Sequence, residues 1–154
     1  TRDFRMTHKG LVFEIKTTEK KSRTHTISSV DQLTKKINEE GAYLVSIGIK
    51  REKGGVAHTI DSLAKLIEAR LEDELLINKF YNLLKERKWK KESVCDISLI
   101  LSTGIPMSFF PFQNVPTILP LPSDISDATW VVNLKDDDAL SRIERDDILD
   151  SVLK

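Results

Sequence analysis

Apolar and polar residues alternate along residues 11–18, in the segment Leu-Val-Phe-Glu-Ile-Lys-Thr-Thr. Phe13 and Ile15 occupy one phase of this alternation, whereas Glu14 and Lys16 occupy the other. A period of two predicts a β-strand, because successive side chains of a strand point to opposite faces of the sheet. Glu14 and Lys16 are therefore expected on the same face of one strand.

Other short segments have a similar β-type pattern. Residues 3–6 are expected to form a hairpin with residues 11–18, because His8-Lys9-Gly10 supplies a glycine-containing connection. Residues 43–49 alternate between apolar and smaller or polar side chains, which predicts a well-buried strand. The remaining predicted strands are residues 24–28, 96–101 and 130–134.

Helical spacing predicts three helical regions. The first runs from a cap at Ser28 or Ser29 through Asn38, with apolar residues recurring at intervals of three and four. Residues 60–84 repeat apolar positions at helical spacing and are expected to form two helices that meet near 72–73. Residues 138–154 are expected to form a terminal helix. All five prolines lie between residues 106 and 122, which predicts an extended crossing segment without regular ladders.

This mixture of elements predicts an α/β fold in which helices cover a sheet. A chain of 154 residues with 40% hydrophobic residues has enough material for one core, so we expect a single domain spanning residues 1–154. Residues 1–58 would hold the motif-bearing sheet and first helix, and residues 59–90 the helical pair. Residues 91–154 would hold the proline-rich crossing segment, the closing strands and the C-terminal helix.

Composition and charge exclude several classes of protein. The 24 Lys and Arg balance the 24 Asp and Glu, which excludes a generally polycationic nucleic-acid coat. Residues 1–53 nevertheless hold 12 basic against 7 acidic side chains, and residues 120–154 hold 4 against 9. A single cysteine, Cys95, excludes an intrachain disulfide and a cysteine zinc site. No apolar run approaches eighteen residues, so we expect a soluble, cytoplasmic protein without a membrane partner.

The hairpin prediction places Asp3 and Glu14 on neighbouring strands, where two carboxylates could converge on one small volume. Hard oxygen ligands select Mg²⁺ or Mn²⁺, and the backbone carbonyl of Ile15 is a further candidate ligand. The ammonium of Lys16, on the same face as Glu14, would orient a water and offset developing negative charge. The alternative is that Glu14 and Lys16 lie on an ordinary solvated strand face with a cross-strand ion pair.

The spacing from Asp3 to Glu14-Ile15-Lys16 resembles the D…(D/E)xK signature of the PD-(D/E)XK nuclease superfamily. The resemblance is closest over residues 3–33 and extends loosely over most of the chain, and it points to a bacterial family of PD-(D/E)XK motif proteins. It implies the restriction-endonuclease-like fold, a mixed central β-sheet flanked by α-helices. It also implies a Mg²⁺- or Mn²⁺-dependent DNA endonuclease that hydrolyses phosphodiester bonds in a restriction-modification or phage-defence (antiviral) system.

The same resemblance assigns roles to individual residues. It implies that Asp3 and Glu14 are metal ligands and that Lys16 positions water or stabilises charge. In several branches of the superfamily a glutamine on the helix after the core strands reaches the active site, which is the role implied for Gln32; a polar residue near a helix cap is the alternative. Hydroxyl and basic side chains near the motif are candidate contacts to DNA phosphates. They are Thr17, Thr18, Lys20, Lys21, Arg23, His25 and Ser28.

The chain departs from the family pattern in two places. Arg2 rather than proline precedes Asp3. The family resembled also carries an N-terminal helical region with an acidic residue that joins the site, so the resemblance implies an N-terminally truncated chain that is catalytically incomplete. Two alternatives to an endonuclease remain: a non-catalytic module that binds DNA or scaffolds a defence complex, and a plain interaction domain. Expected partners are DNA, defence-system subunits and a second copy of the chain.

Overall fold

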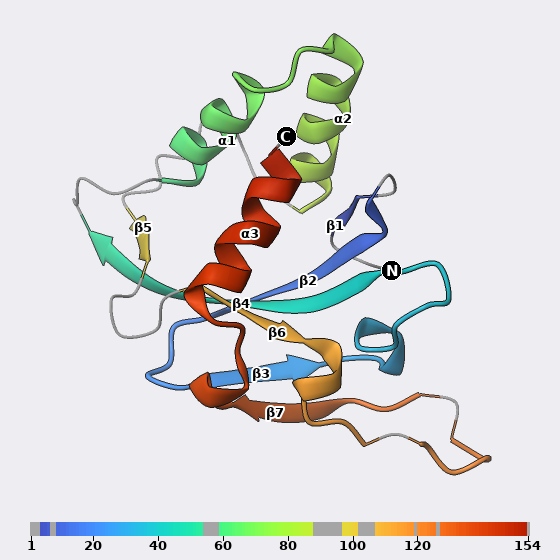
Figure 1. Ribbon diagram of the computed structural model, residues 1–154. Helices are drawn as coiled ribbons and strands as arrows, with labels where there is room; N and C mark the ends of the chain where they lie inside the picture. Colours follow the sequence, from blue (N-terminus) through green and yellow to red (C-terminus); the bar gives the residue numbers. More distant parts are fainter. Residues whose placement is uncertain are drawn as a thin grey trace. The chain divides into compact units, whose positions relative to one another are not determined.

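A computed structural model describes residues 4–6, 9–53, 59–87, 97–101, 107–118, 120–125 and 127–153 (Figure 1). The chain divides into two compact units. The first contains residues 1–49 and 101–154, and the second contains residues 50–100. All of the described candidate site residues belong to the first unit.

The main sheet is mixed. Strands β2 (Leu11–Thr18) and β4 (Gly41–Lys53) run parallel, and β1 (Phe4–Met6) pairs antiparallel with β2. Strand β6 (Ser108–Pro111) pairs antiparallel with β4, and β5 (Ile97–Leu101) follows β4 in the strand order. The predicted hairpin of β1 and β2 is therefore confirmed.

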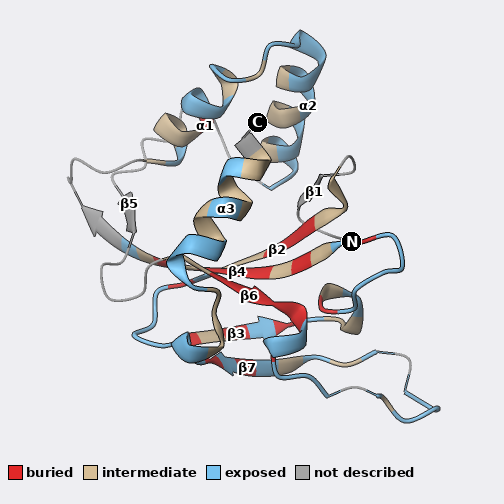
Figure 2. Cartoon of the chain, viewed as in Figure 1, coloured by how far each residue is buried: buried red, intermediate tan, exposed pale blue. Residues whose placement is uncertain are grey.

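A second, two-stranded sheet covers one face of the main sheet. Strands β3 (Arg23–Ile27) and β7 (Trp130–Leu134) lie side by side and antiparallel (Figure 1). Their inward side chains pack against the main sheet in one apolar core. Figure 2 shows the buried residues of these strands in red. The central members of this core are Val12, Ile27, Leu44, Phe110 and Val132.

Helix α3 (Arg142–Leu153) packs on the opposite face of the main sheet. Phe13, Val45 and Phe109 form a buried aromatic and aliphatic cluster there, and Leu149 of α3 packs against it. The sheet is thus enclosed between a helix and a small sheet, which confirms the α/β class. Alternate side chains of β2 point to opposite faces of the main sheet, as predicted: Phe13 faces α3, and Glu14 faces β3 and β7.

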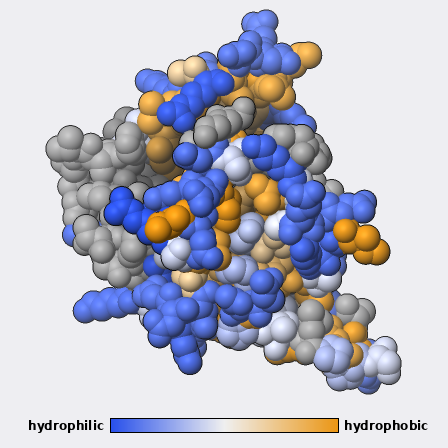
Figure 3. Space-filling model, in the orientation of Figure 1, coloured by the Kyte–Doolittle hydropathy of each residue, from blue (hydrophilic) through white to orange (hydrophobic). Residues whose placement is uncertain are grey.

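The second unit contains the predicted pair of helices, α1 (Ile60–Glu68) and α2 (Glu74–Glu86). Both begin at side-chain caps: Thr59 Oγ1 accepts from the Ser62 N–H, and Asp73 Oδ1 accepts from the Leu75 N–H at 2.7 Å. None of the helices in the described ranges is both long and apolar enough to span a bilayer. Hydrophilic side chains cover much of the face shown in Figure 3.

The helix predicted for residues 29–38 is wrong. Only a 3-10 turn, η2 (Val30–Gln32), forms there. Leu33 is buried but Ile37 is fully exposed, so the apolar side of the predicted helix is not covered along its whole length. The Thr34 hydroxyl instead donates to the Val30 carbonyl. A helix this short is marginal without tertiary packing, which explains the irregular chain.

Two other boundaries differ from the prediction. The terminal helix begins at Arg142 rather than Asp138, because Ser141 and Glu144 form a capping box in which each side chain bonds the other's backbone N–H. The three aspartates before it form a separate 3-10 turn, η4 (Asp136–Asp138). The proline-rich segment also contains the regular strand β6, which tolerates Pro111 because that proline is its last residue.

Gly10 sets the connection between β1 and β2. Its φ is +58°, and its carbonyl accepts from the Glu40 N–H at 2.8 Å. A Cβ at this position would lie 2.9 Å from Glu40 Cγ and 3.0 Å from Glu40 N. Gly10→Ala is therefore expected to lower the free energy of unfolding by about 1–2 kcal/mol, measured by urea denaturation.

The double variant Gly10→Ala/Glu40→Ala separates the causes of that loss. It should recover only part of the stability, because the backbone N of residue 40 still crowds the new methyl group and φ remains positive. A Gly10→Ala protein as stable as the wild type would contradict this account of the turn.

Candidate active site

Glu14 and Lys16 meet on the face of β2 that is turned toward the small sheet. The Glu14 side chain is 2% exposed, and its Oε1 lies 3.1 Å from Lys16 Nζ. The Lys16 side chain is 20% exposed, so its ammonium lies at the boundary between the interior and solvent. A cation that neutralises a buried carboxylate can in this way remain accessible to a ligand.

Gln32 completes the surroundings of the Lys16 ammonium. Its Oε1 lies 3.4 Å from Lys16 Nζ and accepts hydrogen bonds from the backbone N–H of Ser28 at 2.9 Å and from the Ser28 hydroxyl. The structure thus places Gln32 beside Lys16 of the motif. The residue lies on the turn η2, however, rather than on the expected helix. Lys16 is held between a carboxylate and an amide oxygen.

A cleft of about 550 Å³ opens beside Lys16, between β2 and β3. We call it the Lys16 cleft. Its lining carries threonine hydroxyl groups and the ammonium groups of Lys16 and Lys20, together with the carboxylate of Glu19. Hydroxyl and ammonium groups are of the kinds that contact phosphates. The residues that line it are Ile15, Lys16, Thr17, Thr18, Glu19, Lys20, Thr24, His25 and Thr26. Of the candidate phosphate contacts, the cleft collects Thr17, Thr18, Lys20 and His25, whereas Lys21, Arg23 and Ser28 do not line it.

Arg23, predicted as a contact to DNA phosphates, is instead buried in contacts within the protein. It is the first residue of β3, its side chain is 4% exposed, and its Nε donates to Asp136 Oδ1 at 2.6 Å. Its Nη1 donates to Ser46 Oγ at 3.2 Å, and its Nη2 donates to Ser108 Oγ at 2.8 Å. The guanidinium also lies over the Phe110 ring. Arg23 therefore ties β3 to β4, β6 and η4.

Ser46 is a buried polar residue that the sequence analysis missed. It is 0% exposed and stands opposite Lys16 in the parallel pairing of β2 and β4. The only signal in the sequence was a polar residue within the apolar alternation of residues 43–49, on the phase opposite Val45. A role for this polar residue could be inferred only from the pairing register of β2 and β4, which places Ser46 beside Lys16 and facing β3.

His25 joins Ser46 to the Lys16 cleft. The ring is 4% exposed, and its Nε2 lies 2.8 Å from Ser46 Oγ. Burial, together with the positive charges of Lys16 and Arg23, lowers the pKa of His25 from 6.5 to about 4. His25 is therefore neutral at pH 7 and offers a ligand hydrogen bonding rather than charge.

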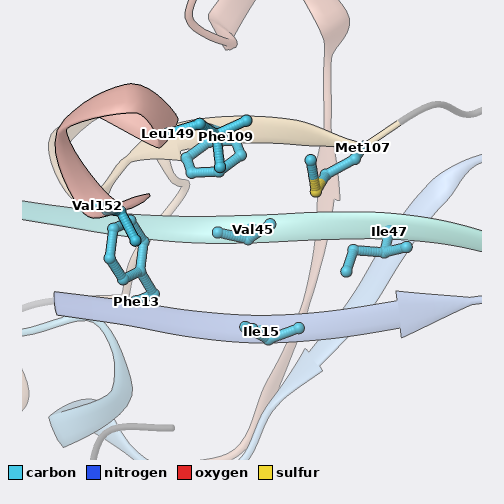
Figure 4. A pocket seen from close by; sticks show the side chains of 8 residues that line it. All are labelled: Phe13, Ile15, Val45, Ile47, Met107, Phe109, Leu149 and Val152. Carbon is cyan, nitrogen blue, oxygen red and sulfur yellow. The ribbon is translucent and has the colours of Figure 1, made fainter. Parts of the chain in front are cut away.

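An apolar hollow of about 220 Å³ lies on the other face of the sheet, on the side of α3 (Figure 4). Figure 4 shows Phe13, Ile15 and Val45 on this side with Met107 and Phe109. The hollow has no polar lining, so it offers nothing to a phosphate or a metal ion. Glu14, Lys16 and Gln32 lie on the opposite face from this hollow.

Residues 1–135 match the model of a protein family described as "Putative PD-(D/E)XK family member, (DUF4420)". The chain belongs to this PD-(D/E)XK family. The match covers most of the chain, including the whole of the Glu14–Lys16–Gln32 arrangement. No curated protein and no solved structure matched the chain.

Membership of the PD-(D/E)XK family indicates a nuclease-like function, and nucleases of this superfamily generally use divalent metals. The described residues bring no group of three His, Cys, Asp or Glu side chains together. They do supply the buried carboxylate of Glu14 and the adjacent carbonyl of Ile15. This oxygen chemistry fits Mg²⁺, which commonly takes only one or two carboxylates from a protein. The third expected ligand, Asp3, lies outside the described residues.

The lowered pKa of His25 predicts how the stability of this PD-(D/E)XK protein depends on pH. The unfolded chain, with a histidine pKa near 6.5, binds the proton more tightly than the folded chain does. The contribution of neutral His25 is therefore fully present above pH 6.5 and is lost as the pH falls toward 4. It amounts to roughly 3 kcal/mol over that window.

Urea denaturation at a series of pH values measures this effect. Carboxylates also titrate on the acid side, so His25→Gln, which cannot gain the proton, is the matched control. The free energy of unfolding should fall less steeply in His25→Gln than in the wild type as the pH is lowered from 6.5. Equal slopes in the two proteins would contradict the prediction.

Proposed function

We propose that this protein is a metal-dependent DNA endonuclease that hydrolyses phosphodiester bonds in a bacterial restriction or phage-defence system. The observation that carries the proposal is the position of the Lys16 ammonium, held between Glu14 Oε1 at 3.1 Å and Gln32 Oε1 at 3.4 Å at the edge of a hydroxyl-lined cleft. Membership of the PD-(D/E)XK family supports DNA as the substrate. The defence role rests on the family resemblance alone.

Glu14, the carbonyl of Ile15 and Asp3 are the residues proposed to hold Mg²⁺ or Mn²⁺. When bound, such an ion would polarise the scissile phosphodiester and lower the pKa of a water molecule. Glu14 suits this role because its carboxylate is already excluded from bulk water, where electrostatic interactions are stronger than at the surface. The adjacent Lys16 offsets part of its negative charge.

Lys16 is proposed to stabilise the negative charge that develops on the phosphate as the bond to the leaving oxygen breaks. An ammonium that is fixed before the reaction begins does this without reorganising at the moment of reaction. Gln32 acts on Lys16 rather than on the substrate. Its Oε1 is itself held by the Ser28 backbone N–H, so it limits the directions that the flexible lysine side chain can take.

The Lys16 cleft is proposed to bind the DNA backbone. Lys20 supplies a further positive charge, and Thr17 and Thr18 supply hydroxyl groups. Contacts of these types hold phosphates without reading the base sequence. The proposal therefore predicts that binding weakens steeply as salt is raised.

Metal removal and a Glu14 variant test the proposed function. Supercoiled plasmid should be cut in Mg²⁺ or Mn²⁺ and left intact in EDTA. Glu14→Gln keeps the size of the side chain and one acceptor oxygen but removes the charge, so cleavage should fall about 100-fold or more. The control Glu40→Gln changes an exposed glutamate and should cut normally.

Gel-shift measurements with the same variants distinguish the endonuclease from the two alternative functions. A protein that shifts DNA in a gel, never cuts it, and is indifferent to Glu14→Gln would be a non-catalytic binding or scaffolding module. A protein that neither binds nor cuts DNA would be an interaction domain. Either result would overturn the endonuclease proposal.

A further inference from the structure

His25 occupies a position in the Lys16 cleft that neither the PD-(D/E)XK motif nor the proposed metal ligands explain. It lies in the middle of β3 and faces β2 and β4, and it is one of the residues that line the cleft containing Lys16. Within the described part of the chain, the ring's hydrogen bond is made through Nε2, to Ser46 Oγ at 2.8 Å. The second ring nitrogen, Nδ1, remains for a ligand.

The hydrogen bonds of Ser46 favour one position for the ring proton, because one of the two acceptor lone pairs of its Oγ is already occupied. Arg23 Nη1 lies 3.2 Å from Ser46 Oγ, and a guanidinium can only donate, so Ser46 Oγ accepts this bond. The hydroxyl hydrogen of Ser46 is then available to point at His25 Nε2. With Nε2 acting as the acceptor, a neutral imidazole carries its proton on Nδ1.

Arg23 is itself held in a fixed orientation toward Ser46. Asp136 accepts from its Nε at 2.6 Å, and Ser108 Oγ accepts from its Nη2 at 2.8 Å. Because two groups on other elements fix the guanidinium, its orientation toward Ser46 does not depend on the cleft being occupied. The chain of contacts from Asp136 to His25 therefore prepares the ring before a ligand arrives.

Neutral His25 can contact a phosphate through a hydrogen bond alone, whereas a lysine would also bring a positive charge. The positive charges of Lys16 and Arg23 both oppose protonation of the ring, as does its burial. A neutral N–H can donate to a phosphate oxygen without adding a further charge next to Lys16. It would therefore orient the phosphodiester while leaving charge stabilisation to Lys16.

We propose that Arg23 and Ser46 hold His25 as the tautomer protonated on Nδ1, and that this N–H donates a hydrogen bond to a phosphate oxygen of DNA bound in the Lys16 cleft. The proposal rests on the proposed function, since it names a further substrate contact at the same site. His25 is the contacting residue, whereas Arg23 and Ser46 are positioning residues.

Long-range ¹H–¹⁵N NMR spectra of the full chain at pH 7 test the tautomer directly. The expected result is a proton on Nδ1 of His25 in the wild type and a mixture of tautomers in Ser46→Ala. A wild-type ring protonated on Nε2 would overturn the proposal. An unchanged tautomer in Ser46→Ala would also overturn it, because Ser46 would then not fix the ring.

Binding of a short DNA duplex in EDTA tests the contact. In His25→Asn the side-chain amide N–H can take the place of Nδ1–H, whereas in His25→Gln it lies nearer the place of Nε2. The Gln variant should bind about tenfold more weakly than the Asn variant, and equal affinities would overturn the proposal. If either variant fails to fold, the Nδ1–H resonance of the wild type decides: it should shift when DNA is added, and no shift overturns the proposal.

These measurements separate this proposal from the proposed function. They use no metal ion and require no cleavage. A protein that binds DNA through His25 Nδ1–H but never cuts it would defeat only the endonuclease proposal. A protein that cuts DNA in a Lys16-dependent reaction, with His25 protonated on Nε2, would defeat only the present one.

Discussion

Replacing Lys16 by methionine is expected to reduce DNA cleavage by about 1,000-fold while leaving the protein folded. The substitution keeps an unbranched side chain of similar length in the space between Glu14 and Gln32 and removes the ammonium. The negative charge that develops on the phosphate would then lose the cation that the structure holds ready for it. Initial rates of plasmid cutting in Mg²⁺ measure the loss.

Two further variants make the Lys16 result specific. Lys16→Arg keeps the charge, but its planar fork does not reproduce a compact ammonium between two oxygen acceptors, so it should restore only a minor part of the rate. Lys135→Met removes an exposed lysine outside the cleft and should cut at the wild-type rate. Circular dichroism establishes that each variant is folded. A folded Lys16→Met protein with full activity would end the case for Lys16 in catalysis.

The second large effect concerns stability rather than chemistry. Arg23→Ala is expected to lower the free energy of unfolding by about 3–5 kcal/mol. The side chain is 4% exposed, so its removal leaves a cavity over Phe110 and takes hydrogen-bond donors from Ser46 and Ser108. Because Arg23 connects β3 to the main sheet, the loss should appear as a lower midpoint in urea denaturation.

The three consecutive aspartates at η4 provide controls for Arg23. Asp136→Ala removes the carboxylate that receives Arg23 Nε at 2.6 Å, from an aspartate whose own side chain is 78% exposed. Because only the Arg23 side of this pair is buried, the substitution should cost about 1–2 kcal/mol. Asp137→Ala, at an exposed neighbouring position, should change stability by less than about 0.5 kcal/mol. Similar losses in Asp136→Ala and Asp137→Ala would show that the buried network contributes little.

Much of the fold follows from local patterns. The alternation in residues 11–18 placed Glu14 and Lys16 on one face, and the strand at residues 130–134 was predicted with its observed boundaries. The pair of helices in the second unit was also predicted, with a break near Asp73 that is now seen as a helix cap. These features depend on residues only a few positions apart, so a single sequence is enough to identify them.

The wrong predictions share a different cause. Residues 29–38 have helical spacing, but the spacing produces a helix only if something covers its apolar side, and Ile37 is fully exposed. Conversely, residues 108–111 form a strand that ends in Pro111, because β4 offers them a pairing edge. In both segments the outcome was decided by the presence or absence of a distant partner, which local propensity does not encode.

The candidate site likewise combines features that depend on local sequence with features that depend on tertiary contacts. By itself the sequence determined that a carboxylate and an ammonium two residues apart share a strand face, because the geometry of a strand is local. Only the tertiary structure decided that Gln32 accepts from Lys16, that Ser46 lies opposite Lys16, and that β3 brings His25 to the cleft. Those contacts depend on strand register and on the packing of one sheet over another, which arise from interactions between residues far apart in the chain.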